Sequence, residues 1–364
     1  MMIDRNEKGE TIMNLKKGIC FLLAGALGTG TILGGCSRKD TTEDAVSAKG
    51  GYIEEEMEAP WQEGEYYMGS FFNQEGNLEV YTGSDSDSGT PQVFSYTYTG
   101  GGNWDQQEES WAESLLGTDS TAYTLIQGED QNLYLMTVKN SQEDSQSEET
   151  QSSESEEVNI DDLIQEWHLY RYAGEGEAQE LYPECLSEEG QREAGGFFPY
   201  YFGVNQEGDP AFMGMGSEIA IYDKDTGKEQ YTFPSYMVMN SSDSMADISG
   251  NTLAVLGNED QDLVLYDTQT GEETGTIDFG DQDRGQLCAA GEGTYYLANP
   301  KGIFVYKEDG SIVEQIYDAG RGVMGETASS LIFNHFLAGE NEDFYALYTD
   351  YETQELSICY YYYN

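Results

Sequence analysis

The sequence predicts an all-β fold, an irregular β-propeller of six to seven four-stranded blades. A strand–turn–strand motif recurs around Tyr222, Tyr266 and Tyr306, and the spacings of 44 and 40 residues match the length of one propeller blade. The 28 tyrosines suit pleated, half-buried strands. Apolar residues at the three- and four-residue spacing of amphipathic helices are scarce.

The clearest copies of the motif span residues 219–227, 263–271 and 303–310. Apolar side chains alternate with their neighbours before each tyrosine, as the face of a strand requires. The first two copies end in Asp-x-x-Thr-Gly, at Gly227 and Gly271, where an Asp acceptor and a glycine that tolerates positive φ favour a hairpin turn. Each copy is therefore expected to supply a hairpin to one blade.

Looser copies extend the array in both directions, so that six units are visible. The added strands are expected at 71–72, 78–81 and 93–98 for the first unit, at 123–126, 133–138 and 167–172 for the second, and at 331–337, 344–348 and 356–362 for the last. A seventh unit could arise from strands shared between the two ends. Short strands with regular turns also fit a sandwich, but about 300 residues of repeat favour a propeller. The stretch 105–116 is expected to form either a short helix or a long loop.

Residues 1–35 are predicted to be a leader that contains a lipoprotein signal peptide. Lys16 and Lys17 form a positive segment before the apolar run 18–33. This run is shorter than the ~20 residues that a membrane-spanning helix needs, and it has the length and flanks of a secretory signal. Met13 is an expected alternative start.

Leu33, Gly34, Gly35 and Cys36 close this leader and resemble the lipobox of bacterial lipoproteins. The resemblance implies that Cys36 carries a diacylglycerol, which would hold the chain on the cell membrane, facing the extracellular side. Two acyl chains give stable anchoring because burial contributes ~0.8 kcal/mol per methylene. Residues 36–60 are polar and charged, so they are expected to be a flexible tether. Residues 61–364 would form the propeller-like domain, with a disordered acidic insertion at 140–159.

The charge is extreme and uneven. The formal net charge is −53; residues 1–40 hold six basic and four acidic side chains, which is +2, and residues 41–364 hold ten and 65, which is −55. Such a surface repels phosphate backbones, so nucleic acid is excluded as a partner. It favours solubility outside the cell and would attract cations or basic partners.

No catalytic set is visible. His168 and His335, the two histidines, are expected to be strand residues bonded to backbone, and no G-x-S-x-G pattern accompanies them. Glycoside hydrolysis, which needs two placed carboxylates, is the one enzyme class left open. Two acidic turns lack the continuation of a calcium loop, so no metal or other cofactor is predicted; they are Asp223-Lys-Asp225 and Asp281-Gln-Asp283.

The cysteines do not form a disulfide framework. Cys20 lies in the leader, and the odd set Cys185, Cys288 and Cys359 is widely spaced. Cys288 and Cys359 are expected to be small buried hydrophobes. One surface disulfide stays open as an alternative.

The layout of residues 36–364 is similar to that of surface lipoproteins of Gram-positive anaerobes, in which a propeller-like segment precedes the solute-binding domain of a sugar ABC importer. The resemblance implies a non-enzymatic propeller that binds a ligand or partner, with importer components or surface glycans as candidates. Two other hypotheses stay open: a cell-surface glycan hydrolase and a protein-assembly scaffold. No ligand-binding residue can be named from the sequence.

Overall fold

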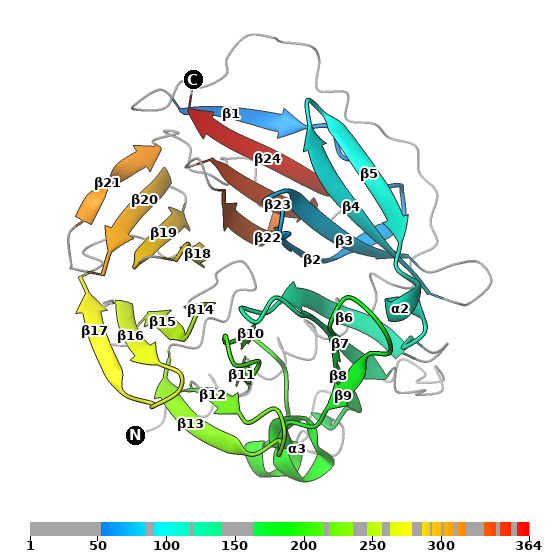
Figure 1. Cartoon of the computed structure of the whole chain (residues 1–364), viewed down its shortest axis with the longest axis vertical. Helices are drawn as coiled ribbons and strands as arrows, with labels where there is room; N and C mark the ends of the chain where they lie inside the picture. The colour runs from blue at the N-terminus through cyan, green and yellow to red at the C-terminus, as the bar shows by residue number, and fades with distance from the viewer. Residues whose placement is uncertain are drawn as a thin grey trace, which may run out of the picture.

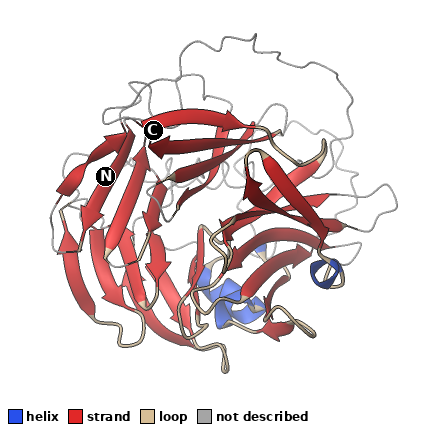
Figure 2. Cartoon of the chain, turned by 45° about the horizontal axis from the view of Figure 1, so that its top comes forward, coloured by secondary structure: helices blue, strands red, loops and turns tan. Residues whose placement is uncertain are grey.

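The computed structural model describes residues 52–84, 91–116, 120–139, 163–214, 218–235, 246–256, 263–278, 286–291, 293–299, 302–308, 312–317, 331–339, 343–350 and 355–363. Within these ranges, six four-stranded antiparallel sheets form a ring, which is a six-bladed β-propeller (Figure 1). The predicted fold class is confirmed. Figure 2 shows the same ring tilted, with strands making up nearly all of it.

Each blade runs from an inner strand at the centre of the ring to an outer strand at its rim (Figure 1). Blade 1 contains β2 (Glu65–Phe72), β3 (Leu78–Ser84), β4 (Gln92–Gly100) and β5 (Asn103–Glu108). Blade 2 contains β6 (Ser120–Gln127), β7 (Leu133–Lys139), β8 (Trp167–Tyr172) and β9 (Gln179–Leu181). Blade 3 contains β10 (Tyr201–Val204), β11 (Pro210–Met213), β12 (Glu218–Tyr222) and β13 (Glu229–Pro234).

The second half of the ring repeats the arrangement. Blade 4 contains β14 (Ala246–Ser249), β15 (Thr252–Leu256), β16 (Leu263–Asp267) and β17 (Glu273–Ile277). Blade 5 contains β18 (Gln286–Ala289), β19 (Thr294–Asn299), β20 (Gly302–Lys307) and β21 (Ile312–Tyr317). Blade 6 contains β22 (Leu331–Ala338), β23 (Phe344–Asp350) and β24 (Leu356–Tyr363), and its outer strand is β1 (Tyr52–Met57).

The ring closes through this sixth blade, and here the sequence prediction needs a correction. Residues 52–57 were expected to belong to the flexible tether 36–60, but β1 pairs antiparallel with β24 from Tyr52↔Tyr363 to Met57↔Ile358. The Trp61 Nε1 donates to the Leu356 carbonyl at 3.2 Å just beyond the strand. Strands from the two ends of the chain thus complete the sixth blade and do not form a seventh.

The core is divided among the junctions between blades. Each buried apolar cluster of the described residues joins two neighbouring sheets. Leu265 of blade 4, for example, shares a cluster with Tyr306 of blade 5. Tyr222 and Tyr306 of the repeated motif are 7% and 1% exposed, respectively, which explains the aromatic period: each copy supplies a ring to a blade–blade junction.

The predicted hairpin turns are confirmed in blades 3 and 4. Gly227 and Gly271 both have φ of 72°, a conformation that favours glycine. Asp223 Oδ1 accepts from the Thr226 amide at 2.7 Å, and Asp267 Oδ1 accepts from the Thr270 amide at 2.9 Å. The carboxylates of these turns therefore satisfy backbone donors.

Helical structure in the described part of the chain is short. The stretch predicted as a helix or loop at 105–116 contains the end of β5 and α2 (Ser110–Glu113). Two further elements, η2 (Glu184–Leu186) and α3 (Glu188–Ala194), connect blades 2 and 3. None of the helices among the described residues is long and apolar enough to cross a membrane. The leader 1–35, Cys36 and the predicted insertion 140–159 lie outside the described residues.

Candidate functional site: a pocket between blades 1 and 2

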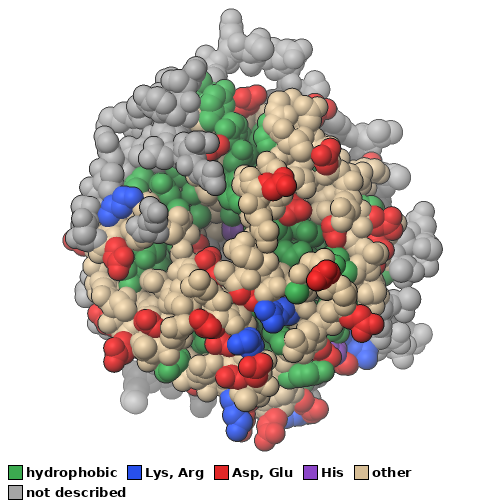
Figure 3. Space-filling model, viewed as in Figure 1, with side chains coloured by type: hydrophobic (Ala, Val, Ile, Leu, Met, Phe, Trp, Pro, Cys, Tyr) green, Lys and Arg blue, Asp and Glu red, His purple; other side chains and the backbone are tan. Residues whose placement is uncertain are grey.

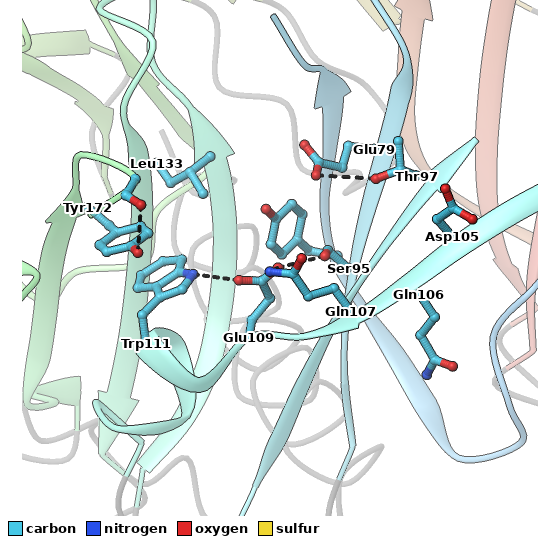
Figure 4. A pocket seen from close by; sticks show the side chains of 12 residues that line it. Glu79, Ser95, Thr97, Asp105, Gln106, Gln107, Glu109, Trp111, Leu133 and Tyr172 are labelled. Atoms are coloured by element: carbon cyan, nitrogen blue, oxygen red, sulfur yellow. Dashed lines mark hydrogen bonds between the residues drawn. The ribbon is translucent and has the colours of Figure 1, made fainter. Parts of the chain in front are cut away.

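A pocket of about 270 Å³ lies between blade 1 and blade 2 (Figure 4). Blade 1 supplies residues of β3, β4 and β5, and the other wall comes from α2, β7 and the end of β8. The lining residues are Glu79, Tyr81, Ser95, Thr97, Asp105, Gln106, Gln107, Glu109, Trp111, Leu133, Tyr172 and Gly174.

Strand register explains why polar side chains gather on this face of blade 1. Glu79 pairs with Thr97, which pairs with Asp105, so these three form one row across β3, β4 and β5. A second row runs parallel to it through Tyr81, Ser95 and Gln107. Side chains directly opposite one another in a sheet share a face, as do side chains two residues apart in a strand. The two rows therefore make one continuous polar wall.

The opposite wall is built on two aromatic side chains. Trp111 of α2 stacks on Tyr172, which ends β8, with ring centroids 4.4 Å apart and planes 7° apart. The Tyr172 hydroxyl donates to the Gly174 carbonyl at 2.9 Å, which fixes its ring. The stack forms a flat aromatic surface beside the polar wall (Figure 4).

Glu109 links three of the elements that line the pocket. Its carboxylate is buried and accepts from Ser95 Oγ at 2.6 Å, from Gln107 Nε2 at 3.2 Å and from Trp111 Nε1 at 2.9 Å. One donor comes from each of β4, β5 and α2. Because charge-assisted hydrogen bonds are stronger than neutral ones, Glu109 fixes the position of Trp111 relative to blade 1.

Glu79 and Tyr81 have few hydrogen bonds within the described residues. Glu79 is half-buried, and burial followed by the charge of Glu109 raises the pKa of its carboxyl, against a lowering by the Thr97 hydroxyl at 3.5 Å. The Tyr81 side chain is 3% exposed, and no hydrogen bond of its hydroxyl is found within the described residues. Burial, followed by Glu79 and Glu109, raises the Tyr81 pKa. Both groups can still accept hydrogens from a ligand.

The lining carries one sign of charge. It contains Glu79, Asp105 and Glu109 but no Lys, Arg or His. Acidic side chains are also spread over the face of the propeller shown in Figure 3. The pocket suits a neutral or cationic ligand that donates hydrogen bonds and has a face for the aromatic stack.

The two histidines lie away from this pocket. His168 was expected to bond to backbone, but its Nδ1 lies 2.6 Å from Glu180 Oε1 and its Nε2 lies 3.3 Å from Glu166 Oε1. His335 Nδ1 lies 3.0 Å from Ser70 Oγ, which in turn lies 2.9 Å from the Tyr67 hydroxyl. Side chains therefore hold the His168 ring, whereas His335 contacts both the hydroxyl and the backbone of Ser70.

The other residues considered from the sequence form no site among the described residues. The Asp223 carboxylate is taken up by its own turn, and the hydrogen bonds from Thr226 lower its pKa; Asp281 and Asp283 lie outside the described ranges. Within those ranges, no three His, Cys, Asp or Glu residues are grouped to hold a metal ion. Cys185, Cys288 and Cys359 form no disulfide within the described ranges, and Cys288 is buried and Cys359 partly so.

Sequence reasoning assigned a ligand-binding role to none of the residues that line this pocket. One signal was present in Leu78-Glu-Val-Tyr81, where Leu78 and Val80 are fully buried and Glu79 and Tyr81 face the opposite side. The alternation predicts two faces, and the polar face of a strand between two blades is a place to look for a ligand. The partnership of Trp111 and Tyr172, by contrast, depends on the fold.

No family model and no curated protein matches the chain. Solved structures that it resembles include a streptogramin B lyase (14% identity, TM-score 0.45, covering 86% of this chain and 98% of that chain). Two others are YCF48 bound to a D1 peptide (12%, 0.45, 86% and 97%) and a gluconolactonase from Xanthomonas campestris (11%, 0.45, 87% and 92%). At these identities, neither the ligands nor the reactions of those proteins transfer to this chain.

Proposed function

We propose that this protein is an extracellular lipoprotein, anchored to the membrane through Cys36, whose propeller binds a carbohydrate without acting on it. The pocket between blades 1 and 2 carries this proposal. An aromatic stack there faces a wall of carboxylate, amide and hydroxyl groups.

The composition of the pocket fits a hydroxyl-rich ring. Carboxylates of Glu79 and Asp105 can accept hydroxyl hydrogens, and the amide of Gln107 can donate as well as accept. The apolar face of a sugar ring would lie along the exposed part of the Trp111 and Tyr172 stack. A volume of about 270 Å³ is at the lower end of ligand pockets, which suits a monosaccharide or one end of a glycan.

Hydrolysis of the same ligand is the second candidate, because the pocket contains three carboxylates, from which a pair could be drawn, and burial raises the pKa of Glu79 in the direction that favours a general acid. The hydrogen bonds of Glu109 argue for binding instead. Its carboxylate is buried under donors from Ser95, Gln107 and Trp111, so it is not free to attack a sugar or activate a water. A hydrolase would have to use Glu79 and Asp105, which lie in one row on the same wall and do not flank the pocket from opposite sides. Binding is therefore the better-supported function.

A glycan array followed by calorimetry tests the binding site. We expect at least one glycan to bind, and both Glu79→Ala and Tyr172→Ala to weaken that binding by about tenfold or more, since each removes a ligand contact. Glu108→Gln is the matched control, because Glu108 is an exposed neighbour outside the lining. A glycan that binds all variants equally would place the site elsewhere, and release of a shortened glycan would establish the hydrolase.

The anchor is tested separately. Cells expressing the chain are fed a clickable fatty acid, and we expect label on the wild-type protein and none on Cys36→Ala. Label that survives the substitution would contradict the proposed anchor. If the chain serves an importer, permease components should co-purify with it after mild cross-linking.

A further inference from the structure

The pocket between blades 1 and 2 holds negative charge that no lining side chain compensates. Glu79, Asp105 and Glu109 face a volume without a basic residue. Burial alone would be expected to favour neutral groups at such a place, because an unpaired charge in a low-dielectric site is costly. The repulsion between Glu79 and Glu109 adds to that cost.

A second observation concerns the Tyr81 hydroxyl. Its side chain is 3% exposed, it lines the pocket, and it has no hydrogen-bond partner within the described part of the chain. The groups that act on it electrostatically are acidic: Glu79, Glu109 and the Tyr172 phenol. The Tyr81 hydroxyl opens onto the pocket, so a ligand group that donates to its oxygen makes a hydrogen bond that no described protein group supplies.

We propose that the ligand carries a protonated primary amine beside its hydroxyls, as in an amino sugar whose nitrogen is not acetylated, and that this ammonium lies between Glu79 and Tyr81. This inference rests on the proposed carbohydrate binding and adds the charge of the ligand. An ammonium offers three donors and no acceptor. Glu79 accepts one as a carboxylate, and the Tyr81 oxygen accepts another.

The aromatic wall fits the same ligand. A cation close to the face of a tryptophan or tyrosine is attracted by the ring quadrupole. Trp111 is oriented by Glu109 and backed by Tyr172, so its position is set before a ligand arrives. A sugar that presents its ring to this stack and its nitrogen to Glu79 would use both walls of the pocket (Figure 4).

Other cations and sugars fit less well. A hard metal ion takes six to eight oxygen ligands, and no suitable cluster exists within the described residues. An N-acetylated sugar has no charge to offset Glu79, and an anionic sugar would be repelled by all three carboxylates. The charge of the ligand is therefore expected to determine which of several closely related sugars binds most tightly.

The test compares two ligands that differ at one group. Oligomers of β-1,4-linked glucosamine and their fully N-acetylated counterparts of equal length are titrated into the full-length chain in mild detergent, near neutral pH, by calorimetry. We expect the amine form to bind at least about tenfold more tightly, the size of one charge-assisted hydrogen bond. In Glu79→Gln that preference should fall to about twofold, and Tyr81→Phe should reduce it in the same direction without removing a charge.

General attraction to an acidic protein needs its own control. Glu108→Gln removes one exposed carboxylate adjacent to the pocket residue Glu109 and should leave the preference unchanged. Equal loss in Glu108→Gln and Glu79→Gln would overturn the inference, as would equal or tighter binding of the N-acetylated oligomer by the wild-type chain. If both oligomers bind equally and Tyr172→Ala abolishes both, the carbohydrate site stands and the amine does not. If neither binds and the array also finds no glycan, both proposals fail.

Discussion

Asp247 and His335 are partly buried on inner strands, and their pKa values are shifted in opposite directions. Asp247 of β14 accepts from the Ala289 amide at 2.7 Å and from its neighbour Ile248 at 2.9 Å. Burial raises the pKa of its carboxyl from 3.8 to about 7. Burial lowers the pKa of the His335 imidazole on β22 from 6.5 to about 4. Between pH 7 and pH 4 these two groups are expected to change stability with opposite signs.

The signs follow from proton uptake. In this pH range the folded chain holds a proton on Asp247 that the unfolded chain has released, so acidification stabilises the fold through Asp247. His335 does the reverse, because the unfolded chain takes up a proton that the folded chain refuses. At 1.36 kcal/mol per pKa unit, the Asp247 shift corresponds to a gain of about 4 kcal/mol and the His335 shift to a loss of about 3 kcal/mol. The two contributions nearly cancel in the wild-type chain.

Two substitutions separate the contributions. On going from pH 7 to pH 4, the change in unfolding free energy of Asp247→Asn should be more negative than that of the wild type by about 4 kcal/mol, because the gain from the carboxyl is lost. The change in His335→Gln should be more positive than that of the wild type by about 3 kcal/mol, because the loss from the imidazole is removed. Urea unfolding followed by tryptophan fluorescence at the two pH values measures both.

The change with pH, and not the stability at one pH, is the informative quantity. Asp247→Asn also loses an acceptor for a backbone amide, and this loss lowers stability at every pH. If both variants follow the wild-type pH dependence to within about 1 kcal/mol, the burial of these groups does not shift their titration and the reasoning is wrong.

Three further predictions concern the fold. Gly69→Ala should destabilise the fold by more than about 3 kcal/mol, because an added Cβ would lie 1.7 Å from the Leu125 carbonyl oxygen of the next blade. Gly275→Ala is the control, because its added Cβ meets nothing closer than 3.7 Å and should change stability by less than about 1 kcal/mol. Chemical denaturation measures both. Deleting residues 52–57 should lower the unfolding free energy by roughly 3 kcal/mol or more, which a lower melting temperature would show. The deletion also exposes the edge of β24, so size-exclusion chromatography should show concentration-dependent association. Burial raises the thiol pKa of Cys185 and Cys288 to about 12, so peptide mapping should find both unlabelled by iodoacetamide in the native chain at neutral pH and labelled in urea.

The repeat was predictable from the sequence because its signals are local. In β12 and β16 the apolar alternation, the tyrosine and the Asp-x-x-Thr-Gly turn follow one another within nine residues. Each signal is sufficient for a strand or a hairpin, and the period between copies adds the propeller. The strand β1 was missed because Tyr52-Ile-Glu-Glu-Glu-Met57 shows no sustained alternation. Its partner is at the other end of the chain, and an edge strand exposed to water does not need an apolar face.

The pocket was not predictable for a related reason. Glu79 reaches Asp105 only through the register of three strands, and Trp111 meets a tyrosine that is 61 residues away in the chain and belongs to another blade. Among 65 acidic residues beyond position 40, nothing local distinguishes Glu79 or Glu109 from carboxylates that face water. Only the folded structure distinguishes the acidic residues that line the pocket from those that face water.

The pairing of β1 with β24 determines when the sixth blade can fold during synthesis. Among the described strands, β1 is the first to be synthesised and its partner β24 is the last, since Tyr52 pairs with Tyr363. Blades 1 to 5 can assemble as they emerge, because their strands are consecutive in the chain. The sixth cannot: in a chain interrupted before β24, the sixth sheet is incomplete and β1 has no partner strand in it. Proteolysis of such unfinished chains would begin at those two open edges.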